Sequence, residues 1–141
     1  MIGHAERSMF TNRERLLYRD AARLVEAMPA DTAYGEIRCH ELARAVGAML
    51  SLEVQDGYYG FVDHSWLWTR PLADCHILTS RVGFPNILDV YAVGRMPMVM
   101  LLDAEHTCLP HVGWAYRPDK LRDDIRWDVV ERLIALMRKV S

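Results

Sequence analysis

Two kinds of hydrophobic spacing divide this chain, and they constrain its fold more than any other feature. Near both ends, apolar residues recur every three or four positions, which is the spacing of one buried face of an α-helix. Between residues 52 and 102, short apolar or alternating runs are separated by glycine and proline, which is typical of β-strands. The sequence therefore predicts helices on either side of a central run of strands, which is an α+β fold.

Three helices follow from the helical spacing. Thr11 or Asn12 can cap the first helix, and Pro29 ends it. Cys39 lies at the start of the second helix, and the third is C-terminal. The expected helices cover residues 12–28, 38–50 and 120–140.

Four strands are expected in the central region. Gly57 predicts a bulge or turn in the first strand, Gly60 ends it, and the segment 94–97, with its glycine and proline, ends the third. Residues 70–86 form a long connection between the second and third strands, and residues 103–118 have the composition of a loop. The expected strands cover residues 52–59, 64–69, 87–93 and 98–102.

Length and composition indicate one globular domain, residues 1–141. A chain of 141 residues is long enough for a single sizeable core, and 51% hydrophobic with 26% charged residues is ordinary for such a protein. The net charge is −2, and no basic run is interleaved with aromatic residues. We therefore expect no nucleic-acid partner and no membrane partner.

The cysteines and the N-terminal residues indicate in which cellular compartment the protein is expected. Cys39, Cys75 and Cys108 are an odd and sparse set, which argues against a disulfide framework. The first residues lack the apolar stretch of a signal peptide, and the longest apolar run, residues 96–102, is too short to cross a bilayer. These features predict a cytoplasmic protein in which Cys39 is a free thiol.

Three residues stand in settings that suit a nucleophile, its base and the group that orients the base. Cys39 opens a helix, whose partial positive charge favours thiolate over thiol. His64 begins one apolar strand, and Asp89 lies inside another, where a carboxylate needs a partner such as an imidazole. If the strands are neighbours and the helix packs against them, the imidazole can take the thiol proton while the carboxylate holds the ring.

These stretches resemble the transglutaminase-like branch of the papain-like cysteine peptidases. The similar segments are Arg38 to Leu42 at the helix start, His64-Ser65-Trp66, and Ile87 to Val90, within residues 36–93. The resemblance implies an antiparallel sheet packed against the cysteine-bearing helix. It also implies that Cys39 is the nucleophile, His64 the general base and acid, and Asp89 the orienting carboxylate.

The chain departs from that family pattern at several points. The interval from Cys39 to His64 is short, the connection between the strands of His64 and Asp89 is long, and Val90 follows Asp89 where proline often stands. No upstream glutamine or tryptophan is present as an oxyanion donor, which leaves Tyr34 and the amide of Cys39 as candidates. Tyr34 and Trp66 are the expected walls of a substrate cleft.

The predicted chemistry is acyl transfer from an amide through a thioester on Cys39, as a peptidase, amidase or deamidase. The expected partner is a peptide or protein amide substrate, with hydrolysis as the default, and no cofactor and no metal are expected. A non-catalytic binding module with the same papain-like fold is the alternative. Taken singly, a cysteine is commonly a small buried hydrophobe, and a histidine beside Asp63 commonly a structural partner of it.

Two further groups of residues have alternative interpretations. His40 and Glu41 follow the cysteine at helical angles that point away from it, so we expect rim or surface positions, with His40 as an alternative base. His106, Cys108 and His111 could supply three zinc ligands, although structural zinc sites usually have four. A metal-binding regulator is therefore a third interpretation.

Overall fold

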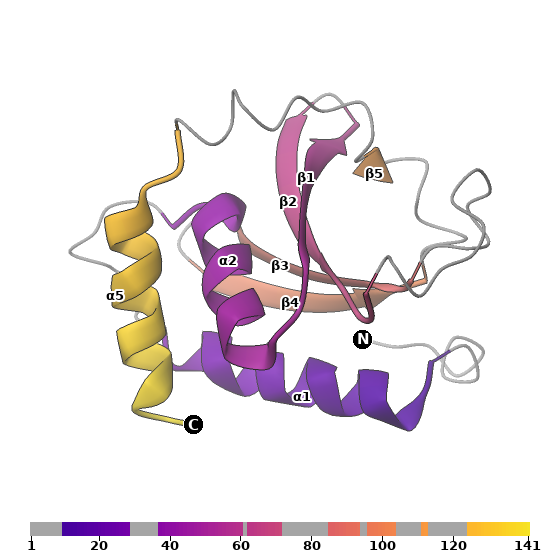
Figure 1. The fold of residues 1–141 in the computed structure, drawn as a ribbon, viewed down its shortest axis with the longest axis horizontal. Helices are drawn as coiled ribbons and strands as arrows, with labels where there is room; N and C mark the ends of the chain where they lie inside the picture. Colours follow the sequence, from indigo (N-terminus) through magenta and orange to yellow (C-terminus); the bar gives the residue numbers. More distant parts are fainter. Residues whose placement is uncertain are drawn as a thin grey trace.

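The computed structural model describes residues 10–28, 37–60, 62–71, 85–93, 96–103, 111–112 and 124–141. In these parts of the chain, helices pack around an antiparallel sheet, which confirms the predicted α+β fold (Figure 1). The elements are α1 (Asn12–Glu26), α2 (Cys39–Leu50), β1 (Val54–Tyr59), β2 (Val62–Trp68), β3 (Ile87–Val93), β4 (Met96–Leu102), β5 (His111–Val112) and α5 (Trp127–Arg138).

The start of α1 is fixed by a capping box. The Thr11 hydroxyl accepts a hydrogen bond from the Glu14 amide, and the Glu14 carboxylate accepts one from the Thr11 amide. Glu14 also accepts hydrogen bonds from the Thr69 hydroxyl (2.7 Å) and the Asn86 amide (2.9 Å). One buried carboxylate therefore attaches the first turn of α1 to the end of β2 and the start of β3.

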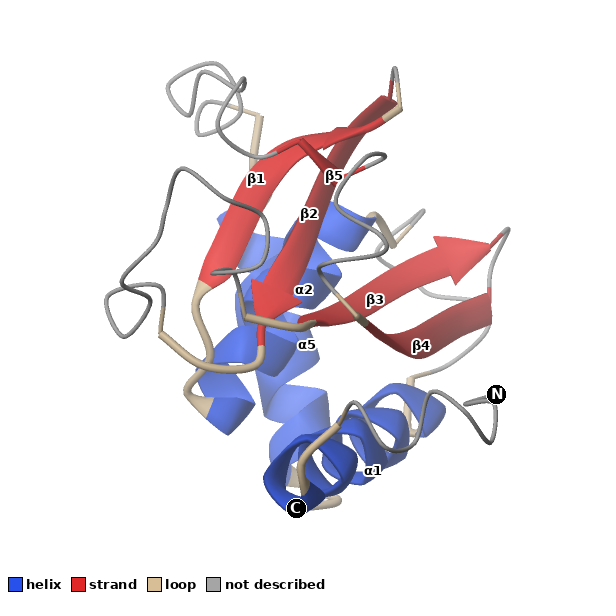
Figure 2. Ribbon diagram, turned by 90° about the vertical axis from the view of Figure 1, so that its right-hand side faces the viewer, coloured by secondary structure: helices blue, strands red, loops and turns tan. Residues whose placement is uncertain are grey.

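The sheet has the strand order β4-β3-β2-β1-β5, and each described pairing is antiparallel. β1 and β2 pair along six positions, whereas β2 and β3 pair only at Leu67 with Leu88 and at Trp68 with Ile87. Beyond these two pairs the strands diverge, and Figure 2 shows β1 and β2 running at a steep angle to β3 and β4. Among the described strands, the half of β2 that carries His64 is therefore paired with β1 alone.

The main core lies between the sheet and the helices. α2 is buried on several sides, because it contacts β2 and β3 on one side and α5 on another. Its residues Leu42, Ala45 and Val46 are fully buried, as expected from the helical spacing. A smaller cluster on the opposite face of β2 contains Trp66, Trp68 and Ile87. The partners of α2 in the main core include Leu67, Leu88, Val90, Val129 and Leu133.

Several predicted boundaries were wrong. β4 begins at Met96 and includes Pro97, because an edge strand does not need every backbone amide for pairing. Gly57 makes neither a bulge nor a turn and pairs in regular register with His64. The two residues of β5 pair with β1 inside the predicted loop of residues 103–118.

The helix ends also differ from the predicted ones. α1 ends at Glu26 rather than near residue 28, and α5 runs from Trp127 to Arg138 rather than from 120 to 140. Arg126, the N-cap residue of α5, has a non-helical backbone and contacts Glu41 of α2, so a tertiary contact accompanies this boundary. No described helix combines the length and hydropathy needed to span a bilayer.

We predict that Gly47→Ala lowers the free energy of unfolding by about 1–2 kcal/mol. A Cβ atom at Gly47 would lie 2.9 Å from Leu67 Cδ2 and 3.0 Å from the carbonyl oxygen of Leu52, closer than packed atoms tolerate. Chemical denaturation measures the change. Ala48→Gly, at the exposed neighbouring position, isolates the helix propensity, which by itself favours alanine by about 1 kcal/mol. A Gly47→Ala variant more stable than the wild type would contradict the close packing of α2 on β2.

Candidate active site

The structure brings Cys39, His64 and Asp89 together from three different elements. Cys39 is the first residue of α2, His64 lies in β2 and Asp89 in β3. The Nε2 atom of His64 lies 2.8 Å from Asp89 Oδ1 and 2.7 Å from Oδ2, and Cys39 is near enough to the ring to contribute to the raised pKa of His64. The spatial convergence that the sequence required is therefore present, while the catalytic roles stay predictions.

The register of the sheet explains why the imidazole meets the carboxylate. Leu67 pairs with Leu88, so one residue further along both strands Trp66 lies level with Asp89. His64 is two residues from Trp66 and shares its face of β2, so it approaches Asp89 diagonally. The Trp66 ring stacks on the His64 ring, with 6.0 Å between centroids and 27° between planes. The imidazole is thus fixed by a hydrogen-bonded carboxylate and by a packed indole.

The N-terminus of α2 gives Cys39 a favourable electrostatic position. Arg38 is the N-cap residue and makes no side-chain cap, so helix geometry leaves the amide of Cys39 without an intrahelical acceptor. The partial positive charge of this helix end favours an anion at Cys39. The residue is only partly buried.

The pKa values of the thiol and the imidazole are shifted in opposite directions. Burial raises the pKa of the Cys39 thiol, but hydrogen bonds to His40 and His64 outweigh it and lower the pKa to about 6. Burial lowers the pKa of His64, but hydrogen bonds to Asp89 and Cys39 outweigh it and raise the pKa to about 9. Between these two pH values the stable form is a thiolate beside an imidazolium.

His40 is not the rim residue that the sequence predicted. Its side chain is buried, with 7% of the residue exposed, and its Nδ1 atom lies 2.6 Å from the Ser65 hydroxyl. The angle between neighbouring helical side chains was interpreted correctly, but the side of the first turn of α2 that carries His40 is covered by β2. A side chain that points away from Cys39 here points toward β2.

Glu41 is also buried, contrary to the prediction of a surface position. It is 0% exposed and accepts hydrogen bonds at 2.7 Å from both Nε and Nη2 of Arg38, and at 2.8 Å from Nη2 of Arg126. Burial raises the pKa of this carboxyl, but the two guanidinium groups outweigh it and hold the pKa below its usual range. The carboxylate therefore joins the start of α2 to the start of α5.

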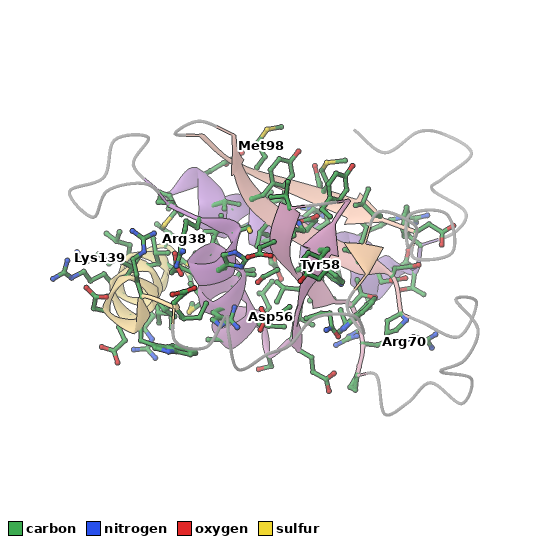
Figure 3. The ribbon with its side chains drawn as sticks, turned by 90° about the horizontal axis from the view of Figure 1, so that it is seen from above. Arg38, Asp56, Tyr58, Arg70, Met98 and Lys139 are labelled. Carbon is green, nitrogen blue, oxygen red and sulfur yellow. The ribbon has the colours of Figure 1, made fainter. Side chains whose placement is uncertain are left out.

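A second group of charged side chains joins α2 to β1, and Figure 3 labels one of them, Asp56. The Arg44 guanidinium donates to Asp56 Oδ2 at 2.7 Å and to the carbonyl oxygen of His40 at 3.1 Å. It also lies over the Trp127 ring, 5.7 Å from the centroid. Asp56 in turn accepts a hydrogen bond from the Ser65 hydroxyl at 2.6 Å. Single-residue patterns could not reveal this chain of contacts, because its members are adjacent only in the folded protein.

The remaining candidate residues are placed only in part. Trp66 is fully buried beneath His64, so it supports the imidazole and does not face solvent as a cleft wall. Tyr34, Cys75, His106 and Cys108 lie outside the described residues, and only the backbone of His111 is described, in β5. Within the described part of the chain, no three histidine, cysteine or acidic side chains form a group that could hold a metal ion.

No protein-family model, curated protein or solved structure matches the chain. The function of the protein must therefore be inferred from the geometry of the site itself. Chemically, this arrangement can hold Cys39 as a thiolate at a helix N-terminus, next to the His64 imidazolium as a proton donor. Asp89 fixes the His64 ring through its Nε2 atom.

We predict that Asp89→Asn lowers the pKa of His64 from about 9 toward its ordinary value, because the amide no longer favours the imidazolium. The pKa of the Cys39 thiol then rises, since a neutral ring stabilises the thiolate less. An NMR titration of the His64 ring measures the first change. Asp63→Asn is the matched control, because Asp63 is adjacent to His64 in sequence and is exposed. A larger shift in the Asp63 variant would make His64 a partner of Asp63 instead.

We predict that Glu41→Gln lowers the free energy of unfolding by about 1–3 kcal/mol, because it removes the charge that two guanidinium groups share in a buried position. Thermal and chemical denaturation measure the loss. Glu131→Gln, an exposed carboxylate on α5, is the control and should change stability little. Equal effects of the two substitutions would mean that the contact between α2 and α5 does not depend on Glu41.

Proposed function

We propose that this protein is a cysteine-dependent acyl-transfer enzyme that acts on amide bonds. Cys39 is the nucleophile, His64 the general acid and base, and Asp89 the carboxylate that orients the ring. The observation that carries the proposal is the pairing of His64 with Asp89, whose carboxylate oxygen lies 2.7 Å from Nε2 of the ring, and the coupling of this imidazole to the Cys39 thiol lowers the pKa of the thiol and raises that of the ring. Sulfur, ring and carboxylate are the parts that a thiol nucleophile needs.

The proposed reaction has two halves. In the first, the Cys39 thiolate attacks the amide carbonyl, and the oxyanion is stabilised by the amide of Cys39 at the helix N-terminus. His64 gives its proton to the leaving amine, the C–N bond breaks, and an acyl thioester remains on Cys39. In the second, His64 removes a proton from water, hydroxide attacks the thioester, and the carboxylic acid and the thiolate are released.

Asp89 has a defined task in this scheme. Because Nε2 of His64 faces Asp89, the other ring nitrogen, Nδ1, is the one left to exchange a proton with the sulfur and the substrate. The carboxylate fixes that orientation and stabilises the imidazolium that forms in each half of the reaction. It is 6% exposed in its side chain, so the interaction is weakly screened by solvent.

The sequence order and the arrangement of elements both support a papain-like, transglutaminase-like organisation. A helix that begins with the cysteine packs on an antiparallel sheet, and neighbouring strands supply first the histidine and then the aspartate. We expect the substrate to be a peptide or protein amide, and hydrolysis to be the default because water needs no binding site of its own. A reducing cytoplasm would keep Cys39 as a free thiol.

We predict that iodoacetamide alkylates Cys39 at pH 6 about tenfold faster than it alkylates the unfolded chain. A thiol with a pKa of about 6 is half ionised at that pH, whereas a free thiol is ionised to well under 1%, and the lower nucleophilicity of the weaker base removes part of this gain. Peptide mapping assigns the adduct to Cys39. Amide hydrolysis should rise around pH 6, where the thiolate forms, and fall around pH 9, where His64 loses its proton.

Two variants give this experiment its controls. Cys39→Ala should remove amide hydrolysis completely, and His64→Ala should slow the alkylation of Cys39 at pH 6. If folded and unfolded protein are alkylated equally fast at Cys39, the thiol is not activated. The non-catalytic binding module would then replace the enzyme as the better interpretation.

A further inference from the structure

The His64 ring lies between two other aromatic rings, one buried and one exposed. Trp66 is 0% exposed and stacks on the imidazole, whereas Tyr59 is 52% exposed and meets it edge-on, with 5.9 Å between ring centroids and 62° between planes. The indole fixes the imidazole, and the mechanism above gives the phenol no task. A half-exposed aromatic ring beside the proposed general base can contact both that base and a bound substrate.

The register of β1 and β2 explains the place of Tyr59. Tyr59 pairs with Val62, and Gly57 pairs with His64. Partners in an antiparallel pair point to the same face, and so do residues two apart in one strand, so Tyr59, Val62 and His64 share a face. Gly57 has no side chain to stand between the rings, so Tyr59 meets the imidazole diagonally. Along this face, Tyr59 and Val62 lie on the opposite side of His64 from Trp66.

The exposed side chains on this face of the sheet are apolar or aromatic. Asp89 contacts His64 and so shares its face, and Asp89 pairs with Met100 of β4. Among the described residues of β1 to β4, the exposed ones on this face are Tyr59 (52%), Val62 (68%), Met98 (45%) and Met100 (38%). Exposed apolar groups therefore flank the histidine–aspartate pair on both sides, and an apolar side chain of a substrate would bury area against them.

The proposed reaction determines which part of a substrate lies beside Tyr59. The thiolate of Cys39 attacks the carbonyl carbon, so that carbon lies at the sulfur. His64 gives its proton to the amide nitrogen, so that nitrogen lies within hydrogen-bond reach of the imidazole. The residue attached to this nitrogen therefore extends past the imidazole, where Tyr59 and Val62 are exposed.

We propose that Tyr59 is a specificity-determining residue, whose ring packs against an apolar side chain on the residue that carries the leaving amine. Val62, its cross-strand partner, is the second wall of this subsite. This inference rests on the proposed function and deepens it by naming the class of substrate, a peptide amide whose nitrogen belongs to an aromatic or aliphatic residue. It favours cleavage of a substituted amide over deamidation, because ammonia carries no side chain for Tyr59 to contact.

Two alkylating reagents that differ only on the amide nitrogen test the proposal. The Cys39 thiolate displaces iodide from iodoacetamide and from N-benzyliodoacetamide, and the second reagent carries a phenyl ring on the nitrogen side of its amide. The readout is the rate constant for N-benzyliodoacetamide divided by that for iodoacetamide, with the adducts assigned to Cys39 by peptide mapping. Both reagents react with the same thiolate, so a change in its ionisation cancels in this ratio. We expect the wild-type ratio to be about three to ten times that of N-acetylcysteine, and equal ratios would overturn the proposal.

Substitutions of two neighbouring tyrosines show whether Tyr59 is responsible. Tyr59→Phe keeps the ring and should keep the ratio, whereas Tyr59→Ser should lower it to within about twofold of the value for N-acetylcysteine. Tyr58→Ser, which removes the same ring from the opposite face of β1, is the matched control and should keep the wild-type ratio. A Tyr59 ring that only steadied His64 would change both rate constants together, so an unchanged ratio in Tyr59→Ser would overturn the proposal. Circular dichroism checks the fold of each variant, and the comparison of the wild type with N-acetylcysteine decides if Tyr59→Ser does not fold.

The two proposals fail in different ways in these measurements. If iodoacetamide alkylates Cys39 no faster in the folded protein than in the unfolded chain at pH 6, the thiol is not activated and the proposed enzyme function is lost. If iodoacetamide alkylates the folded protein faster but the ratio for the two reagents is the same in the wild type, in Tyr59→Ser and in N-acetylcysteine, the Cys39–His64–Asp89 site stands and only the subsite at Tyr59 is removed.

Discussion

The contact between the first turn of α2 and the middle of β2 is the interaction on which the rest of the candidate site depends. It brings a helix N-terminus, with its partial positive charge, to the strand that carries the imidazole. Neither element makes the site alone. The helix provides the sulfur and its electrostatic setting, the strand provides the imidazole, and the short pairing of β2 with β3 adds Asp89 from one strand further.

Several carboxylates lie near this contact, and each is compensated by its own partner. Asp89 is paired with His64, Asp56 with Arg44, and Glu41 with two guanidinium groups. An isolated buried charge costs free energy, so each carboxylate can be buried near the site only because it has a partner. Because the partners come from different elements, the same ion pairs that neutralise the charges also fix how α2, α5 and the sheet meet.

The sequence predicted the local elements well and the candidate triad in outline. Helical spacing located α2, alternation located β3, and the settings of Cys39, His64 and Asp89 indicated the residues that converge. It did not predict the buried positions of His40 and Glu41, because helical periodicity describes angles around one axis and not which neighbours cover each side. It also missed β5 and the Pro97 portion of β4, since strand pairing and edge position are tertiary properties.

The paired contacts of residues 39 and 40 with residues 64 and 65 link chemical reactivity to the correct alignment of a strand. A slip of β2 by a single position could present serine instead of histidine to the sulfur, and the imidazole would then lie on the face of the sheet away from Asp89. Misaligned or half-formed chains thus keep an ordinary, sluggish thiol. In the proposed enzyme, the reactivity of the thiol would therefore depend on the completed fold.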